Sequence, residues 1–204
     1  MATKKTTDRL LGDMRRAYDL VQERQATEAI EVYRAALAEA RQAGLDSAHL
    51  HWAFAVACDY SGDLEMAFEQ ITVAIEKDPL APPFRHSFEL ITNRIKAALA
   101  DEQRAENDPS TPRLYALLQR AGAVDVASHL AMARHLVATG KAEHARALVD
   151  AVTLLHSGAR EAWEMKAQLA AAAGDVATAE QARIEAAALG NGEPAFAIPG
   201  PASA

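Results

Sequence analysis

Three short stretches of this chain share one pattern. They read SGDLEMAF at residues 61–68, TGKAEHAR at residues 139–146 and AGDVATAE at residues 173–180. Each has a glycine in second place and an alanine in seventh place. The last two stretches are separated by about 34 residues, a period typical of a helix–turn–helix repeat. The first stretch precedes the second by two such periods and a short insertion.

The scarce glycines mark the turns of such a repeat. Along the second half of the chain they follow one another at nearly equal steps, at Gly122, Gly140, Gly158, Gly174 and Gly190. Glycine just past a helix end adopts the left-handed conformation without a Cβ penalty. The spacing therefore predicts successive helices of about 13 to 15 residues joined by short turns, which makes neighbours antiparallel.

The composition favours the same class of fold. Of 204 residues, 50% are hydrophobic, 24% are charged and 48 are alanine. Because alanine is the best helix former and a poor strand former, we expect an all-α protein. The one cysteine, Cys58, excludes an intrachain disulfide and is best interpreted as a small buried hydrophobe.

Charge and hydropathy limit the partners. A net charge of -7 disfavours a nucleic-acid partner, which would demand clustered lysine and arginine. We expect no membrane span and no secretory apolar segment, and hence a cytoplasmic protein. The proline-rich residues 190–204 predict a disordered tail. Its two large apolar residues, Phe196 and Ile198, either stay solvated, which we favour, or dock into a groove of this chain or of a neighbour.

The repeat resembles the tetratricopeptide repeat family. That family places small residues at two helix crossings in each repeat, and this chain has alanine at both in four copies. The first set is Ala17, Ala55, Ala133 and Ala167, and the second is Ala29, Ala67, Ala145 and Ala179. A third small position holds Ala36, Ala74, Val152 and Ala186. Trp163 and Asp78-Pro79 also match the family pattern, while Arg24 stands where the other copies have a turn glycine.

The resemblance implies an α-solenoid of about five antiparallel helix hairpins with a right-handed superhelical course. The expected organisation is a flexible segment at 1–9 and a repeat domain at 10–189. Within that domain the clear repeats are 48–81, 126–159 and 160–189, and the degenerate ones are 10–43 and 82–125. In the last of these, the apolar stripe after Pro82-Pro83 predicts one overlong helix of about 24 residues that continues through Glu106.

In proteins of this family the first helix of each repeat lines a concave groove. Carried over, the groove residues of the second repeat are His49, Trp52, Val56, Asp59 and Tyr60. In the next clear repeat they are Ala127, Leu130, Arg134, Val137 and Ala138, and in the last they are Glu161, Glu164, Gln168, Ala171 and Ala172. For Trp52, a contact between repeats is an equal alternative to a binding role.

We find no motif for catalysis and expect no cofactor and no metal. The histidine pairs are His49 with His51 and His129 with His135, and neither has the spacing of a helical zinc site. The predicted function is a non-catalytic adaptor or scaffold that binds an apolar or basic segment of a protein partner. A secretion or assembly chaperone and an enzyme subunit with a non-local active site remain alternatives, and homo-oligomerisation stays open.

Overall fold

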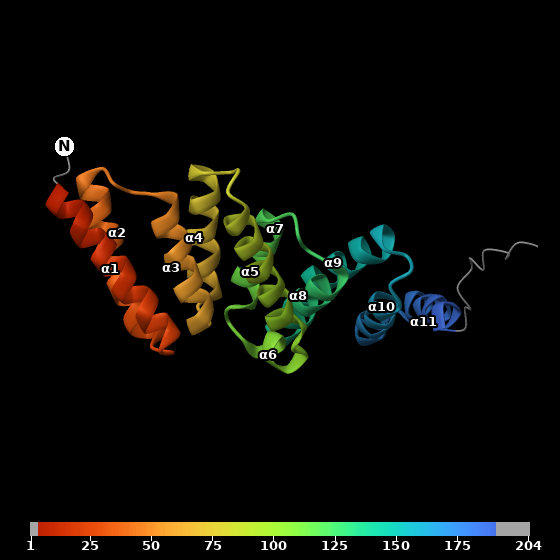
Figure 1. Ribbon diagram of the computed structural model, residues 1–204. Helices are drawn as coiled ribbons and strands as arrows, with labels where there is room; N and C mark the ends of the chain where they lie inside the picture. The colour runs from red at the N-terminus through yellow and green to blue at the C-terminus, as the bar shows by residue number, and fades with distance from the viewer. Residues whose placement is uncertain (1–3, 191–204) are drawn as a thin grey trace, which may run out of the picture. The chain divides into compact units, whose positions relative to one another are not determined.

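One hairpin shows how this sequence builds its repeat. Helix α3 (Ala48–Ser61) begins after Ser47, whose hydroxyl accepts a hydrogen bond from a first-turn amide, and ends at Gly62 with φ 83°. Helix α4 (Leu64–Lys77) begins after Asp63, whose carboxylate accepts an amide hydrogen bond at 3.1 Å. Caps of this kind satisfy amides that have no partner within the helix. The two helices pack side by side (Figure 1).

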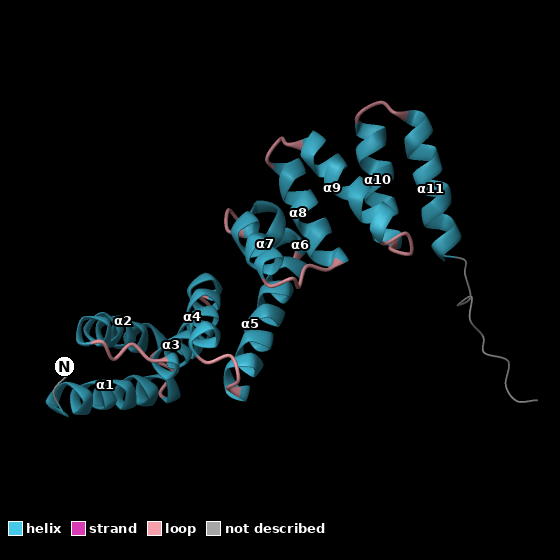
Figure 2. Cartoon of the chain, turned by 90° about the horizontal axis from the view of Figure 1, so that it is seen from above, coloured by secondary structure: helices cyan, strands magenta, loops and turns pink. Residues whose placement is uncertain are grey.

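The computed structural model describes residues 4–190, except for the side chains of residues 102–104. Over these residues it is all helix and turn, without a strand (Figure 2). Besides α3 and α4, the helices are α1 (Lys4–Gln22), α2 (Ala26–Ala43), α5 (Pro82–Ala100), α6 (Glu102–Asn107), α7 (Thr111–Arg120), α8 (Val126–Ala138), α9 (Ala142–Leu155), α10 (Arg160–Ala172) and α11 (Val176–Gly190).

The chain divides into two units, each with its own core. The first unit runs to Ala98 and includes Ala116–Ala123, and the second contains Leu99–Tyr115 and continues from Val124. In the first unit the α1–α2 and α3–α4 hairpins pack together through α2 and α3. In the second unit the α8–α9 and α10–α11 hairpins pack together through α9 and α10. The division passes through α5 and α7 rather than through a linker.

The small residues of the repeat pattern lie at the helix contacts. All of them are buried, with no more than 6% of the surface of any one exposed. They are Ala17, Ala29, Ala36, Ala55, Ala67, Ala74, Ala133, Ala145, Val152, Ala167, Ala179 and Ala186. Because a helix pair can approach closely only where side chains are short, this burial confirms the frame that the sequence predicts. The described chain is therefore an all-α helical repeat of the tetratricopeptide-like kind.

Larger side chains fill the space between the hairpins. In the first unit Tyr33 stacks on Phe54 with ring centroids 6.1 Å apart, and Phe68 lies 5.4 Å from Phe88 of α5. In the second unit Leu130, Val149, Val152 and Met165 form a cluster with the buried alanines. The aromatic contacts thus join each hairpin to the helix that follows it, α2 to α3 and α4 to α5.

The N-terminal helix begins earlier than predicted. The sequence predicts a flexible segment at residues 1–9, but α1 begins at Lys4. Its first turns are held to α2 by the ion pair between Arg9 and Glu39 and by the burial of Leu10, which is 7% exposed. Of the predicted tail, only Gly190 belongs to the described residues, and it is the last residue of α11. Residues 191–204 lie outside them.

The expected overlong helix is wrong. Helix α5 ends at Ala100, and after Asp101 a separate short helix, α6, begins. Two tertiary contacts explain this break. The Thr111 hydroxyl donates a buried hydrogen bond to the carbonyl of Ala105 at 2.7 Å, and His135 Nδ1 of α8 lies 3.1 Å from the carbonyl of Glu106. These contacts hold α6 within the second unit, and the backbone at Asp101 departs from helical geometry to allow them.

Candidate functional site

The predicted groove residues of the first unit lie on α3, and α5 covers part of this face. The Trp52 indole is half-buried, donates a hydrogen bond from Nε1 to Ser87 Oγ at 2.9 Å and lies 5.9 Å from the Phe84 ring. Trp52 therefore makes the contact between helices that was the alternative to a binding role. Because its indole N–H already has a partner inside the protein, Trp52 helps to position α3 against α5 in the free molecule.

Asp59 is also engaged by α5. Its carboxylate lies 3.3 Å from the Arg94 guanidinium, and its carbonyl accepts a hydrogen bond from the same side chain at 3.2 Å. Burial raises the pKa of Asp59, and the charge of Arg94 opposes that rise. Asp59 thus helps to hold α3 against α5 within this unit.

The remaining predicted residues on α3 differ in exposure. Val56 is half-buried, whereas His49 and Tyr60 are exposed, Tyr60 with 63% of its surface. The His49 ring makes edge contacts with Trp52 and Phe84, at 5.9 and 5.3 Å between centroids. Of the five predicted residues on α3, His49 and Tyr60 offer the most surface to a partner.

The second unit has a hollow between α6, α8 and α10, which are brought together by the repeat and by the break before α6. Its volume is about 450 Å³, and we call it the α8–α10 hollow. Its lining residues are Glu106, Arg134, Val137, Met165, Gln168, Leu169 and Ala172. Four of these, Arg134, Val137, Gln168 and Ala172, are groove positions that the resemblance implied. The lining combines four apolar residues with three polar or charged ones, as in many sites that bind a side chain of a partner.

A second hollow adjoins it across α10. This α10–α11 hollow measures about 370 Å³ and is lined by Arg160, Glu164, Ala167, Gln168, Arg183, Ala186 and Ala187. Gln168 lines both hollows, so they lie on either side of this residue of α10. We call the surface made up of the two hollows the α10 groove. It includes the predicted Glu164, whose carboxylate accepts a hydrogen bond from Arg160 Nε at 2.7 Å.

Five of the predicted residues of this unit do not line the α10 groove: Ala127, Leu130, Ala138, Glu161 and Ala171. Leu130 is only 3% exposed and belongs to the core cluster of the second unit, so its assignment to the groove surface is wrong. Glu161 is exposed on α10 but borders neither hollow. The repeat pattern does not predict the lining residues Glu106, Met165 and Leu169. The last two lie one helical turn apart on α10, and that apolar pair was a usable signal, whereas Glu106 is placed by the break after α5.

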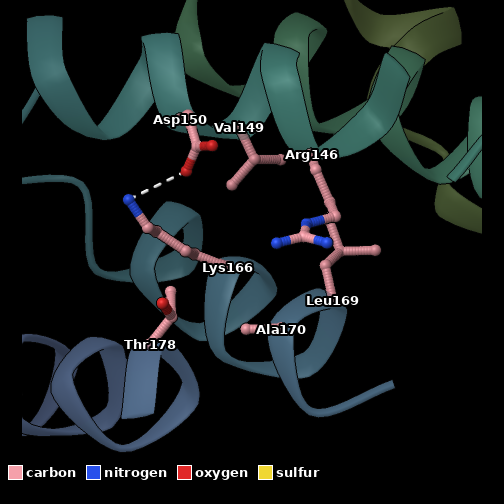
Figure 3. A pocket seen from close by; sticks show the side chains of 7 residues that line it. All are labelled: Arg146, Val149, Asp150, Lys166, Leu169, Ala170 and Thr178. Carbon is pink, nitrogen blue, oxygen red and sulfur yellow. Dashed lines mark ion pairs between the residues drawn. The ribbon is translucent and has the colours of Figure 1, made fainter. Parts of the chain in front are cut away.

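A third hollow, on the side of α10 that faces α9 and α11, contains cationic side chains (Figure 3). Its volume is about 240 Å³. Lys166 Nζ lies 2.8 Å from Asp150 Oδ1, and the Arg146 guanidinium lies 3.9 Å from Asp175. Both cations thus have carboxylate partners within the protein. We interpret this hollow as part of the packing between α9, α10 and α11.

The titratable groups do not assemble into a reactive centre in the described part of the chain. Burial raises the pKa of the Cys58 thiol to about 12, so this thiol stays protonated at neutral pH. Tyr115 Oη lies 2.6 Å from His129 Nδ1; burial raises the pKa of Tyr115, and burial and nearby His156 lower that of His129. Both are neutral at pH 7, which suits a structural hydrogen bond.

Two further features of the described residues concern metal binding and membranes. No three His, Cys, Asp or Glu side chains among them gather where they could share a metal ion. None of the described helices has the length and apolar character needed to cross a bilayer.

Comparisons with known proteins show only remote similarity. No protein-family model and no curated protein matches this chain. Among solved structures it is similar to a double mutant of MamA RS-1, with 12% identity, a TM-score of 0.42 and coverage of 93% of this chain and 98% of that one. A tetratricopeptide repeat protein from Parabacteroides merdae ATCC 43184 gives 15% identity, a TM-score of 0.38 and coverage of 91% and 80%. The repeat assignment rests on the hairpins and buried small residues described above.

Proposed function

We propose that this chain is a non-catalytic scaffold that binds a segment of a protein partner in the α10 groove. The observation that carries the proposal is the composition of the α8–α10 hollow. Val137 exposes 44% of its surface there, beside Met165, Leu169 and Ala172. A hollow lined by exposed apolar side chains beside polar ones is suited to one large apolar side chain of a partner.

The geometry also favours a segment over a small molecule. The two hollows of the groove lie on either side of Gln168 and extend along α10, from Arg160 to Ala172. This stretch of helix spans about 18 Å, the length of roughly five or six residues of extended chain. An extended segment along α10 would therefore place one side chain in each hollow.

Capture of partners by groove variants tests this function. Val137→Glu places a carboxylate among the apolar lining residues, and Leu155→Glu is the matched control. Leu155 is 74% exposed at the end of α9 and lines neither hollow of the α10 groove. We expect proteins captured from the native cells by the wild type to be reduced at least about tenfold by Val137→Glu, because removing the carboxylate from water beneath an apolar side chain costs more than about 1.4 kcal/mol.

The control determines how the result is read. Leu155→Glu should capture the same proteins as the wild type, and both variants should keep the helicity of the wild type in circular dichroism. Equal capture by all three proteins would contradict binding in the α10 groove. A captured set made up of exported proteins would favour the secretion or assembly chaperone, which is a more specific form of the same scaffold.

A further inference from the structure

The α10 groove begins where the described chain ends. Gly190 closes α11 next to Arg160, the first residue of α10, and a Cβ placed on Gly190 would lie 2.8 Å from the Arg160 guanidinium. Arg160 also lines the α10–α11 hollow, together with Ala186 and Ala187 of the last turn of α11. Gly190, the last described residue, thus lies at the edge of the groove.

The segment that follows carries two large apolar residues. Residues 191–204 read NGEPAFAIPGPASA, in which Phe196 and Ile198 are the large apolar side chains. Prolines at 194, 199 and 201 flank them and favour an extended polyproline-type backbone. An extended segment of this kind loses little conformational entropy when it binds a groove.

The length of this segment matches the groove. Phe196 is the sixth residue after Gly190 and lies up to about 20 Å along an extended chain, and Ile198 lies up to about 26 Å away. From Arg160 to Leu169, α10 spans about 14 Å. The segment is therefore long enough for Phe196, and for Ile198 as well, to reach the α8–α10 hollow past Gln168.

We propose that residues 191–204 bind in the α10 groove of the same molecule, with the Phe196 ring in the α8–α10 hollow against Val137, Met165 and Leu169. This inference rests on the proposed function, because it assigns to the same groove an internal occupant that competes with the partner. A tether of this length holds its end group at a millimolar effective concentration, so even a weak intrinsic affinity gives substantial occupancy. A partner must displace the tail, and its apparent affinity is reduced by the fraction of grooves that are open.

Methyl NMR of the full chain, with labelled methionines, tests this occupancy. Met165 is in the α8–α10 hollow, and Met66 of α4 belongs to the first unit. The comparison is between the wild type and the full-length double variant Phe196→Ala with Ile198→Ala. We expect the Met165 methyl resonance to differ between them, because an aromatic ring next to a methyl shifts its resonance. The Met66 methyl resonance should coincide in both proteins.

A peptide in trans sharpens the test. A synthetic peptide of residues 191–204, added to the double variant, should move the Met165 resonance toward its wild-type position. The same peptide with alanine at 196 and 198 should leave it unchanged. Adding Val137→Glu to both proteins should remove the difference between their Met165 resonances and abolish the response of the double variant to the peptide, while the matched Leu155→Glu keeps both.

Three results would overturn the proposal. Coincident Met165 resonances in the wild type and the double variant would show that the tail does not enter the hollow. A shift that depends on protein concentration would assign the tail to the groove of a second copy. A shift that survives Val137→Glu would place the tail elsewhere. Each result leaves partner capture by the groove open, because Val137→Glu and Leu155→Glu test that function without the tail substitutions.

Discussion

At the scale of single residues, one turn departs from the rest. Other turns place a glycine at positive φ just after a repeat helix or its capping residue, as at Gly62 and Gly174. The first hairpin has Arg24 at the corresponding position, and there φ is 63°. The repeat pattern of the sequence also predicts a turn at Arg24. The structure shows that the turn keeps its left-handed form even with an arginine, and the Gln25 amide donates a hydrogen bond across it to the Leu20 carbonyl at 2.8 Å.

Replacing Arg24 by glycine should stabilise the protein. A side chain in the left-handed region is strained by its Cβ, and glycine removes that strain at a smaller entropic cost. We expect Arg24→Gly to raise the free energy of unfolding by about 0.5–1 kcal/mol, measured as a higher urea midpoint with an unchanged m-value. The matched control is Gly174→Arg. A Cβ there meets no atom within 4 Å, so the expected loss of about 1 kcal/mol reports backbone strain alone.

A second residue gives the stability a pH dependence. Asp175 caps α11, and its carboxylate accepts a hydrogen bond from the Thr178 amide at 3.1 Å. The backbone and side-chain hydrogen bonds from Thr178 lower the pKa of Asp175 below its ordinary value of 3.8. A lowered acid pKa stabilises the fold at pH above 3.8, and this contribution is lost as the pH falls through the folded-state pKa.

Asp175→Asn separates the charge from the cap, because asparagine also caps a helix but does not titrate. We expect the wild type to have the higher melting temperature at neutral pH and this advantage to disappear in strong acid. Melting curves of both proteins between about pH 2 and pH 7 would check it. A melting-temperature difference that is constant across this range would contradict the assigned role of the charge.

At the scale of helices, the small residues decide how closely hairpins pack. Ala179 is 1% exposed and faces α10, whereas Ala177 on the same helix is exposed. Both residues belong to an alanine-rich helix, so composition alone does not distinguish them. The repeat frame does, since it assigns Ala179 to a helix crossing.

Leucine at Ala179 and leucine at Ala177 should differ in their effect on stability. Ala179→Leu inserts three heavy atoms into a packed crossing, and we expect a loss of about 1–3 kcal/mol in the free energy of unfolding. Ala177→Leu adds the same atoms on an exposed face and should change stability by less than about 0.5 kcal/mol. Chemical denaturation of both variants compares them. A wild-type stability for Ala179→Leu would show that the frame is shifted.

At the scale of the whole molecule, the two units differ in what their helices bury. Helix α4 buries Phe68 and Ile71, at 2% and 0% exposure. The residues that α11 buries are alanines, at positions 179, 182 and 186. Because the stability of a repeat array is a sum over units and their nearest neighbours, the end with less buried apolar surface opens first.

Hydrogen exchange should therefore differ along the chain. We expect the backbone amides of α11 to exchange at least about tenfold faster than those of α4, because less apolar area must be exposed to open α11. Mass spectrometry of peptides that cover 64–77 and 176–190 measures both rates in one experiment. Equal protection of the two helices would contradict an opening that starts at α11.

The local pattern of the sequence was sufficient for the helices, their turns and the small residues at their crossings, because each of these depends on residues within one or two turns of a helix. It also placed Arg134, Val137, Gln168 and Ala172 on one surface. Three features were decided only by tertiary structure: the break after α5, the cover that Ser87 and Phe84 provide for Trp52, and the burial of Leu130. Each depends on side chains far along the chain or in a neighbouring helix. The hydrophobic periodicity of one helix does not show which other helix will cover a given face.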